Sequence, residues 1–155
     1  MPDDFVAVSR RMVRLQNGRP SQAVLRRALS TAYYALFHTL ARCGADLLVG
    51  GSGASRSTQA WRQVYRALEH GAAGNACRNG EMLSKFPKEI EDFANMFVTM
   101  QDKRHKADYD PTENFWKSSV IQDINAVEQA IKGFKTAPLK DRRAFAAYVL
   151  FKIRK

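Results

Sequence analysis

Apolar residues spaced three or four positions apart constrain this chain more than any other feature. Within the stretch 86–110 they recur with the spacing of one face of an α-helix, at Ile90, Phe93, Phe97 and Met100. The next positions on that face are Arg104 and Ala107. Acidic residues early in the stretch and basic residues late in it suit the helix dipole. The pattern therefore predicts an amphipathic helix that carries an arginine on its buried face.

The rest of the chain repeats this helical spacing and contains no series of strands. Predicted helices cover approximately 3–16, 21–49, 58–70, 86–110, 112–134 and 138–151. The glycine-containing segments 50–58 and 71–80 are predicted to be connections. We therefore expect an all-α, antiparallel up-and-down helical bundle with an extra basic helix at the C-terminal end. One domain is expected, with a core over about 20–135 and an extension over 138–155.

Several residues mark the boundaries and faces of these predicted helices. Ser21 and Thr112 are predicted N-caps, as is either Asp3 or Asp4. Two buried stripes are predicted: Leu25, Leu29, Ala32, Leu36 and Leu40; and Trp116, Val120, Ile124, Val127, Ile131 and Phe134. The aromatic residues of the last helix are expected either to fold back on the core or to form an exposed patch for a partner.

Composition narrows the class of protein. The chain has 155 residues, 45% of them hydrophobic, which is enough for one domain with a real core. No stretch is apolar enough to span a bilayer, and the first residues lack the apolar run of a signal peptide, so we expect a cytoplasmic protein with no membrane partner. Cys43 and Cys77 share no short spacing and accompany no histidine cluster. They are expected to be free thiols, with no metal site and no cofactor.

The net charge of +10 is unevenly laid out along the chain. Between positions 5 and 45 there is no acidic residue, and every basic side chain other than His38 is an arginine. Planar, permanently charged guanidinium groups suit phosphate, so this half favours a nucleic acid or nucleotide partner. The alternative is a solvated basic face in a protein whose composition simply favours arginine.

Arg104 has two interpretations. It cannot lose its proton, so on an inward face it needs an anion, a carboxylate or a wet cleft. It can pair with Asp108, four residues further on, or extend its head to solvent while its stem packs. Alternatively it is a functional arginine at the mouth of a groove.

A second polar face lies on the predicted helix 21–49, away from its leucines. Arg27, Thr31, Tyr34 and His38 follow one another by four, three and four residues, and Arg42 lies one turn further on. A band with so many hydrogen-bonding groups is poorly suited to a dry core and suggests a cleft wall. The alternative is that His38 is an ordinary boundary histidine and the tyrosines pack normally.

Two motifs in this chain resemble the HEPN family of small helical-bundle proteins. They are Ser-Thr-Ala-Tyr-Tyr-Ala-Leu-Phe-His, at 30–38, and Arg-His-Lys-Ala-Asp-Tyr-Asp-Pro, at 104–111. The likeness covers about 20–134, in the family's order of helices. It implies a cytoplasmic homodimer in which the motif helices of two subunits form a cleft. Many relatives are metal-independent RNases, often toxins paired with a nucleotidyltransferase antitoxin; others bind nucleotides or serve as scaffolds.

In RNase members of the family, a histidine follows the motif arginine after four to six residues. Here Arg104 matches the arginine, but Tyr109, Asp110 and Pro111 occupy the positions after it where the histidine is expected. The ordinary pKa values of tyrosine and aspartate lie far from 7, so they are poor substitutes. His105 points about 100° away from Arg104 on a helix. His38 is the better substitute, provided that the long helix lines the cleft.

The sequence therefore favours two alternative functions. In the first, a HEPN-type dimer binds RNA and acts as a metal-independent RNase toxin in a toxin–antitoxin or defence system. Arg104 then faces phosphate, Asp108 orients it, and Tyr109 and His38 complete the catalytic set; Arg27, Thr31, Tyr34, Arg42 and His105 contact the nucleic acid. In the second, the dimer is a non-catalytic module for a nucleotide or a partner protein. Whether the chain is an enzyme is left open, and relatives suggest Tyr109 as a site of nucleotidylation.

Overall fold

The computed structural model describes residues 2–15 and 18–155, and the regular structure in these ranges is entirely helical. The helices are α1 (Pro2–Arg14), α2 (Gln22–Leu48), α3 (Thr58–Ala67), α4 (His70–Arg78), α5 (Gly80–Leu83), α6 (Lys88–Tyr109), α7 (Lys117–Thr136) and α8 (Leu139–Leu150). The predicted all-α bundle is confirmed.

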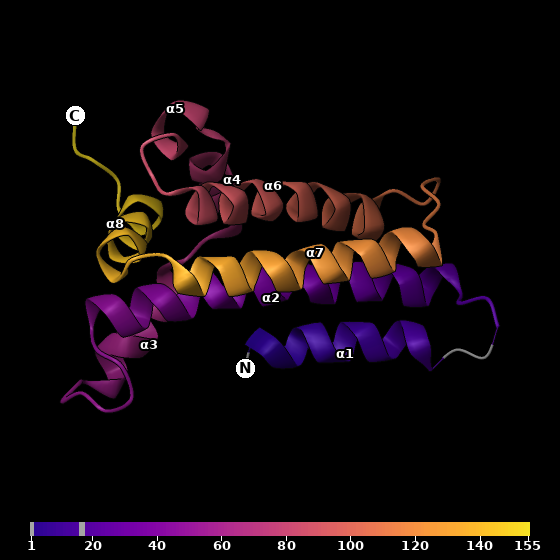
Figure 1. The fold of residues 1–155 in the computed structure, drawn as a ribbon, viewed down its shortest axis with the longest axis horizontal. Coiled ribbons are helices and arrows are strands. Elements are labelled where there is room, and N and C mark those ends of the chain that lie inside the picture. Colours follow the sequence, from indigo (N-terminus) through magenta and orange to yellow (C-terminus); the bar gives the residue numbers. More distant parts are fainter. Residues whose placement is uncertain (1, 16–17) are drawn as a thin grey trace.

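The long helix α2 is the centre of the bundle and packs against α1, α3, α6, α7 and α8. In Figure 1, α1, α2, α6 and α7 run along the long axis, and consecutive long helices point in opposite directions. The short helices α3, α4 and α5 gather with α8 toward one end of the molecule. The opposite end is formed by the connections α1–α2 and α6–α7.

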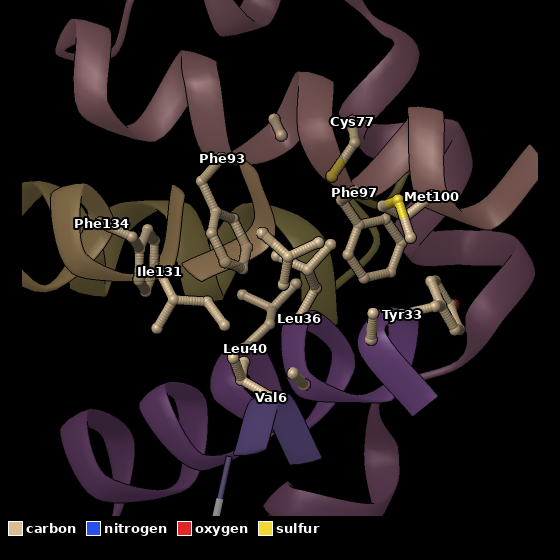
Figure 2. Packing of buried hydrophobic residues seen from close by; sticks show 14 of the residues in the cluster. Val6, Tyr33, Leu36, Leu40, Cys77, Phe93, Phe97, Met100, Ile131 and Phe134 are labelled. Atoms are coloured by element: carbon tan, nitrogen blue, oxygen red, sulfur yellow. The ribbon is translucent and has the colours of Figure 1, made fainter. Parts of the chain in front are cut away.

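The core lies where α2, α6 and α7 meet. Both predicted stripes are buried except for Trp116, and Ile90, Phe93, Phe97 and Met100 of α6 have no exposed surface. Figure 2 shows the α6 aromatics facing Leu36 and Leu40 of α2, with Ile131 and Phe134 of α7 beside them. Each such side chain contributes about 1.5–3 kcal/mol by burial. The helical spacing in the sequence therefore identified the faces that hold the fold together.

The segment 71–80 is helical, which corrects the prediction of a connection. The predicted helix 58–70 ends early, at Ala67, and α4 follows it. Ala73, Gly74 and Cys77 of α4 are buried, and α4 packs on α6 and α8. A Cβ at Gly74 would collide with the amide of Gln101 on α6. The glycine that argues against a helix by propensity thus lies where α4 packs closely on α6, and the Gln101 side chain uses the space that a Cβ would fill.

The start of α7 also differs from the prediction. Thr112 does not cap a helix; its hydroxyl and its backbone N–H both donate to Oδ1 of Asp110, at 2.6 and 2.9 Å. Further on, the side chain of Gln22 accepts from the N–H of Phe115 and donates to its carbonyl, both at 2.9 Å. These bonds keep 112–116 out of the helix, so α7 begins at Lys117 and Trp116 stays exposed.

The two predicted N-caps near the start of the chain have different outcomes. The helix α1 includes Pro2, so positions 3 and 4 lie within its first turn and not at the N-cap position that was predicted for Asp3 or Asp4; Gln16, the predicted end, lies outside the described residues. Ser21 does cap α2, accepting from the N–H of Val24 at 3.2 Å.

The C-terminal helix α8 folds back on the bundle. Phe145 is fully buried, and its ring contacts Phe86, Phe93 and Phe134. The Tyr148 hydroxyl donates to the carbonyl of Ala76 in α4 at 2.9 Å. Of the two alternatives for its aromatic residues, packing on the core is therefore the one observed, although Phe151 beyond the helix is exposed.

Candidate functional site

Arg104 lies at the inner edge of α6, as its place on the apolar face predicts. Only 22% of its side chain is exposed. Its guanidinium carbon is 5.3 Å from the ring centre of Tyr33 and 5.3 Å from that of Tyr34, both on α2. These rings cover one side of the cation and stabilise it by cation–π attraction. The side chain therefore lies in the seam between α2 and α6, one helical turn before a hollow lined by Asp108 and Tyr109; the seam and this hollow together are called the Arg104 cleft.

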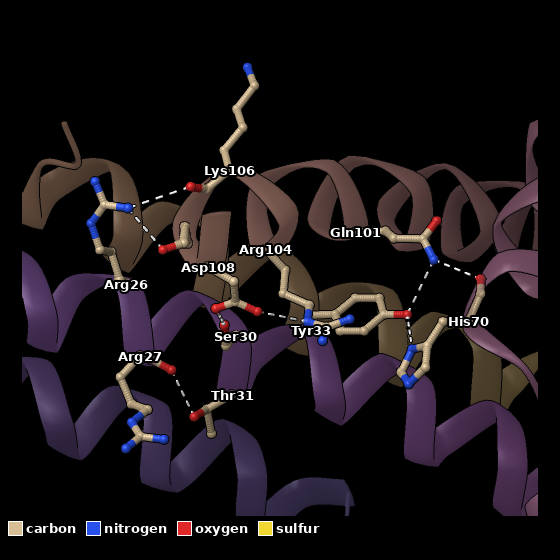
Figure 3. Close-up of polar contacts among 11 residues, drawn as sticks. Arg26, Arg27, Ser30, Thr31, Tyr33, His70, Gln101, Arg104, Lys106 and Asp108 are labelled. Atoms are coloured by element: carbon tan, nitrogen blue, oxygen red, sulfur yellow. Dashed lines mark hydrogen bonds and ion pairs between the residues drawn. The ribbon is translucent and has the colours of Figure 1, made fainter. Parts of the chain in front are cut away.

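The i,i+4 pair between Arg104 and Asp108 is present. Nε of Arg104 donates to Oδ2 of Asp108 at 3.2 Å, and the other carboxylate oxygen accepts from the hydroxyl of Ser30 at 2.7 Å. Figure 3 shows this chain of contacts crossing from α6 to α2. Among the described residues, nothing holds the terminal nitrogens Nη1 and Nη2 of Arg104 by a hydrogen bond. The arginine is thus oriented through Nε, and its outer nitrogens form no hydrogen bond with a described residue.

Tyr33 joins this cleft to α4. Its hydroxyl lies 2.7 Å from Nδ1 of His70, and Nε2 of Gln101 donates to the same hydroxyl at 3.4 Å and to the carbonyl of His70 at 2.7 Å. Burial raises the pKa of Tyr33 to about 12. The Tyr33 side chain is buried and its hydroxyl oxygen already accepts from Gln101, so the hydroxyl hydrogen needs an acceptor. We assign the Tyr33 O–H as the donor and Nδ1 of His70 as the acceptor. This imidazole is then neutral, with its hydrogen on Nε2.

His70 belongs to the site, and sequence reasoning missed it. Its pKa is lowered by burial first, and then by the charges of Arg104 and His38. Its ring stacks on Phe37 at 4.0 Å. The only signal in the sequence was a histidine next to a glycine-rich segment, and reading 71–80 as a connection hid the turn of helix that positions it.

His38 is close to the same cleft but is tied to other partners. Its Nδ1 lies 2.5 Å from the hydroxyl of Tyr65, and its ring stacks on Phe5 of α1 at 4.9 Å. Burial lowers its pKa. The ring of Tyr34 lies 6.1 Å from that of His38. Tyr34 thus touches both Arg104 and His38, and its own hydroxyl has no hydrogen-bond partner among the described residues.

The other residues of the predicted polar face of α2 are dispersed. Arg27 is exposed on the side of α2 toward α1, where it lines a hollow with Met12 and Leu15, and its carbonyl accepts from the hydroxyl of Thr31 at 2.8 Å. Arg42 faces Asp46 at 3.6 Å, further along the helix. The structure therefore places Tyr34 against Arg104 and His38 against Tyr34, but leaves Arg27, Thr31 and Arg42 outside that cleft.

The end of the motif segment is open to solvent. Tyr109 is 69% exposed, and its ring lies 4.9 Å from that of His105, which is also exposed. Tyr109 and Asp108 line a hollow of about 520 Å³ between α6 and the first turns of α2. These two aromatic rings are thus accessible from outside, on the rim of the cleft rather than beside the Arg104 guanidinium.

Arg26 holds this end of α6 in place. Its guanidinium donates to the carbonyls of Ala107 and Asp110, each at 2.8 Å, and to that of Glu113. It thereby satisfies carbonyls that the end of a helix leaves without partners. In the sequence it was one arginine among many in a basic stretch, because nothing local distinguishes an arginine that binds carbonyls from one that faces solvent.

The described residues contain no group of three or more His, Cys, Asp or Glu side chains close enough to hold a metal ion. They also contain no helix that combines the length and the hydropathy of a membrane span. Compared with models of protein families, with curated proteins and with solved structures, the chain finds no match.

Proposed function

We propose that this protein binds RNA in the cleft between α2 and α6, with Arg104 as the residue that faces phosphate. The observation that supports the proposal most is the state of that arginine. It is three-quarters covered and fixed through Nε by Asp108, yet its outer nitrogens are not bound by any described residue. A fixed guanidinium with two free NH₂ groups suits a pair of phosphate oxygens. The net charge of +10 favours an anionic partner as well.

The proposal extends to HEPN-like cleavage without a metal ion. In that reaction the 2′-hydroxyl oxygen attacks phosphorus while a base takes its proton. The P–O5′ bond then breaks and the leaving oxygen takes up a proton, which yields a cyclic phosphate and a 5′-hydroxyl. Arg104 stabilises the charge on the phosphate. His38 is the proposed base: burial favours its neutral form, and with Nδ1–H donating to Tyr65 the lone pair of Nε2 is available.

The proposed assembly is a homodimer that brings two copies of Arg104 to one cleft, as the likeness to HEPN proteins implies. A nucleotidyltransferase antitoxin is the proposed partner in a toxin–antitoxin system, and the exposure of Tyr109 makes its hydroxyl accessible to such an enzyme. Light scattering measures the oligomeric state, and a mass shift on Tyr109 with ATP and the transferase tests the modification. A monomer at micromolar concentration would contradict the dimer.

The substitution Arg104→Ala tests the function. We expect it to lower RNA affinity and to abolish cleavage in the presence of EDTA, while circular dichroism and melting temperature change little. Lys106→Ala, an exposed cation on the same helix, is the matched control and is expected to weaken binding only slightly. His38→Ala is expected to remove cleavage and to leave binding in place. Full RNA binding and cleavage by Arg104→Ala would show the assignment to be wrong.

A non-catalytic binding module is the second candidate, and a specific observation favours it. Nδ1 of His38 and Nδ1 of His70 each face a tyrosine hydroxyl, as expected of histidines that only hold helices together. In this case RNA or a nucleotide binds in a salt-sensitive way and is not cleaved. Incubation of the protein with RNA, with and without EDTA, distinguishes the two candidates.

A further inference from the structure

A second hollow, of about 450 Å³, lies at the end of the molecule where the α1–α2 and α6–α7 connections meet. Its apolar lining comes from Pro20, Leu25, Phe115 and Ile121, and Trp116 forms one wall. The charged residues that line it are Arg19 and Lys117, both exposed cations. The hollow therefore combines an aromatic surface with positive charge and has no acidic side chain in its lining.

Trp116 is presented to solvent by a rigid segment. It is 59% exposed, although a tryptophan gains much by burial. The preceding residue, Phe115, is held through both backbone groups by Gln22, and the carbonyl of Trp116 accepts the N–H of Val120 at 3.0 Å. The guanidinium of Arg19 lies 5.6 Å from the Trp116 ring centre. Because the loop is already ordered by these hydrogen bonds, a ligand that stacks on this ring loses little binding free energy to loop ordering.

The hollow at Trp116 adjoins the hollow at Asp108 and Tyr109, because residues that line one contact residues that line the other. Arg26 lines the hollow that contains Asp108 and Tyr109. The same guanidinium lies 5.2 Å from the ring centre of Phe115, which lines the hollow at Trp116. Gln22 also lines the hollow at Asp108 and Tyr109, and its side-chain oxygen accepts the N–H of Phe115. Each of these two neighbouring hollows thus carries one exposed aromatic ring, Tyr109 in the first and Trp116 in the second.

We propose that the hollow at Trp116 is a base-stacking subsite for single-stranded RNA that continues from the Arg104 cleft. The base stacks on Trp116, and Arg19 and Lys117 bind the flanking phosphates. Exposed aromatics beside cations are how proteins bind single strands, because every unpaired base offers a flat face. A duplex keeps its bases stacked on one another and cannot use such a ring. The inference rests on the proposed RNA binding and adds the form of RNA that is bound.

The test uses tryptophan fluorescence. The chain has two tryptophans, so Trp61→Phe leaves Trp116 as the only reporter. We titrate this variant with a single-stranded oligouridine and with an RNA duplex of the same length. The single strand is expected to quench the emission, and the duplex to leave it unchanged. In the natural background, Trp116→Ala is expected to weaken single-strand binding about 5- to 150-fold, the equivalent of about 1–3 kcal/mol per stacked base.

Two further variants make the result specific. Trp116→Phe retains an aromatic face and is expected to keep most of the affinity, which separates stacking from a loss of structure. Leu139→Ala removes an exposed apolar side chain at the start of α8 and is expected to have no effect.

The outcomes separate this inference from the proposed function. If RNA binding depends on Arg104 but Trp116→Ala binds with unchanged affinity, the subsite is wrong and the proposed function stands. Equal quenching by duplex and single strand overturns the preference for unpaired bases. Quenching that rises with protein concentration in the absence of RNA shows that a second copy covers the ring, and also overturns it. If the natural chain binds no RNA, both proposals fail.

Discussion

Single side chains decide how Arg104 is presented. Asp108 would be an ordinary surface partner on α6 if its second oxygen did not accept the hydroxyl proton of Ser30, a residue only 8% exposed on α2. This bond ties the orientation of the arginine to the packing of two helices. The sequence predicted the pair Arg104–Asp108 from its spacing alone. It could not show the third member, because Ser30 is 78 residues away from Asp108.

A double-mutant cycle measures the energetic coupling between Ser30 and Asp108. Ser30→Ala removes the donor, and Asp108→Ala removes the acceptor. We expect Ser30→Ala to lower the free energy of unfolding by about 1 kcal/mol, since a hydrogen bond to a charged but partly solvated group is modest. The two substitutions together should cost less than the sum of their separate effects, with a coupling of about 0.5 kcal/mol or more. Strict additivity in urea unfolding would show that the contact stabilises nothing.

At the scale of elements, the sequence was most informative where each helix carries its own apolar stripe. The stripes of α2, α6 and α7 were predicted because the spacing of a buried face is a local property. The helix α4 and the start of α7 were missed because contacts with distant residues determine them. Gly74 lies where the side chain of Gln101 from α6 fills the space beside it, and 113–116 stays out of the helix on account of Gln22. For the same reason the site was only half predicted: Arg104, Tyr34 and His38 were named, but His70 was not.

The substitution Gly74→Ala reveals this difference between local preference and packing. Helix propensity alone predicts that alanine stabilises α4 by about 1 kcal/mol. We expect the opposite, a loss of about 1 kcal/mol in the free energy of unfolding, because the new methyl group displaces the amide of Gln101 and with it the hydrogen bonds to His70 and Tyr33. Gly71→Ala, in the same helix with open space around it, is the control and should not destabilise. Denaturant unfolding of both variants is the measurement, and a more stable Gly74→Ala would contradict the packing described.

At the scale of the whole molecule, the bundle is expected to lose stability as the pH falls. The pKa values of His38 and His70 are lowered in the folded state, so each folded imidazole resists a proton that the unfolded chain accepts. Below about pH 6.5, the unfolded state therefore binds more protons, and the free energy of unfolding decreases until the lowered pKa values are passed. The charge of Arg104 adds to this resistance at His70.

Melting temperatures between pH 7.5 and 5.5 test this expectation. The natural chain should melt at lower temperature as the pH falls. His70→Asn keeps an acceptor for the Tyr33 hydroxyl but has no proton to gain, so its melting temperature should depend less on pH. An identical slope in the variant would exclude His70 as a source of the effect.

One ring in the middle of the site has a practical consequence. Tyr34 lies against Arg104, His38 and His70 at once, 5.3 Å from the guanidinium carbon and 6.1 Å from each imidazole. Its aromatic resonances should therefore shift when an anion reaches the arginine and again when either histidine is protonated. A single isotope-labelled tyrosine is in this way a built-in reporter, able to follow occupancy and titration in the unmodified protein.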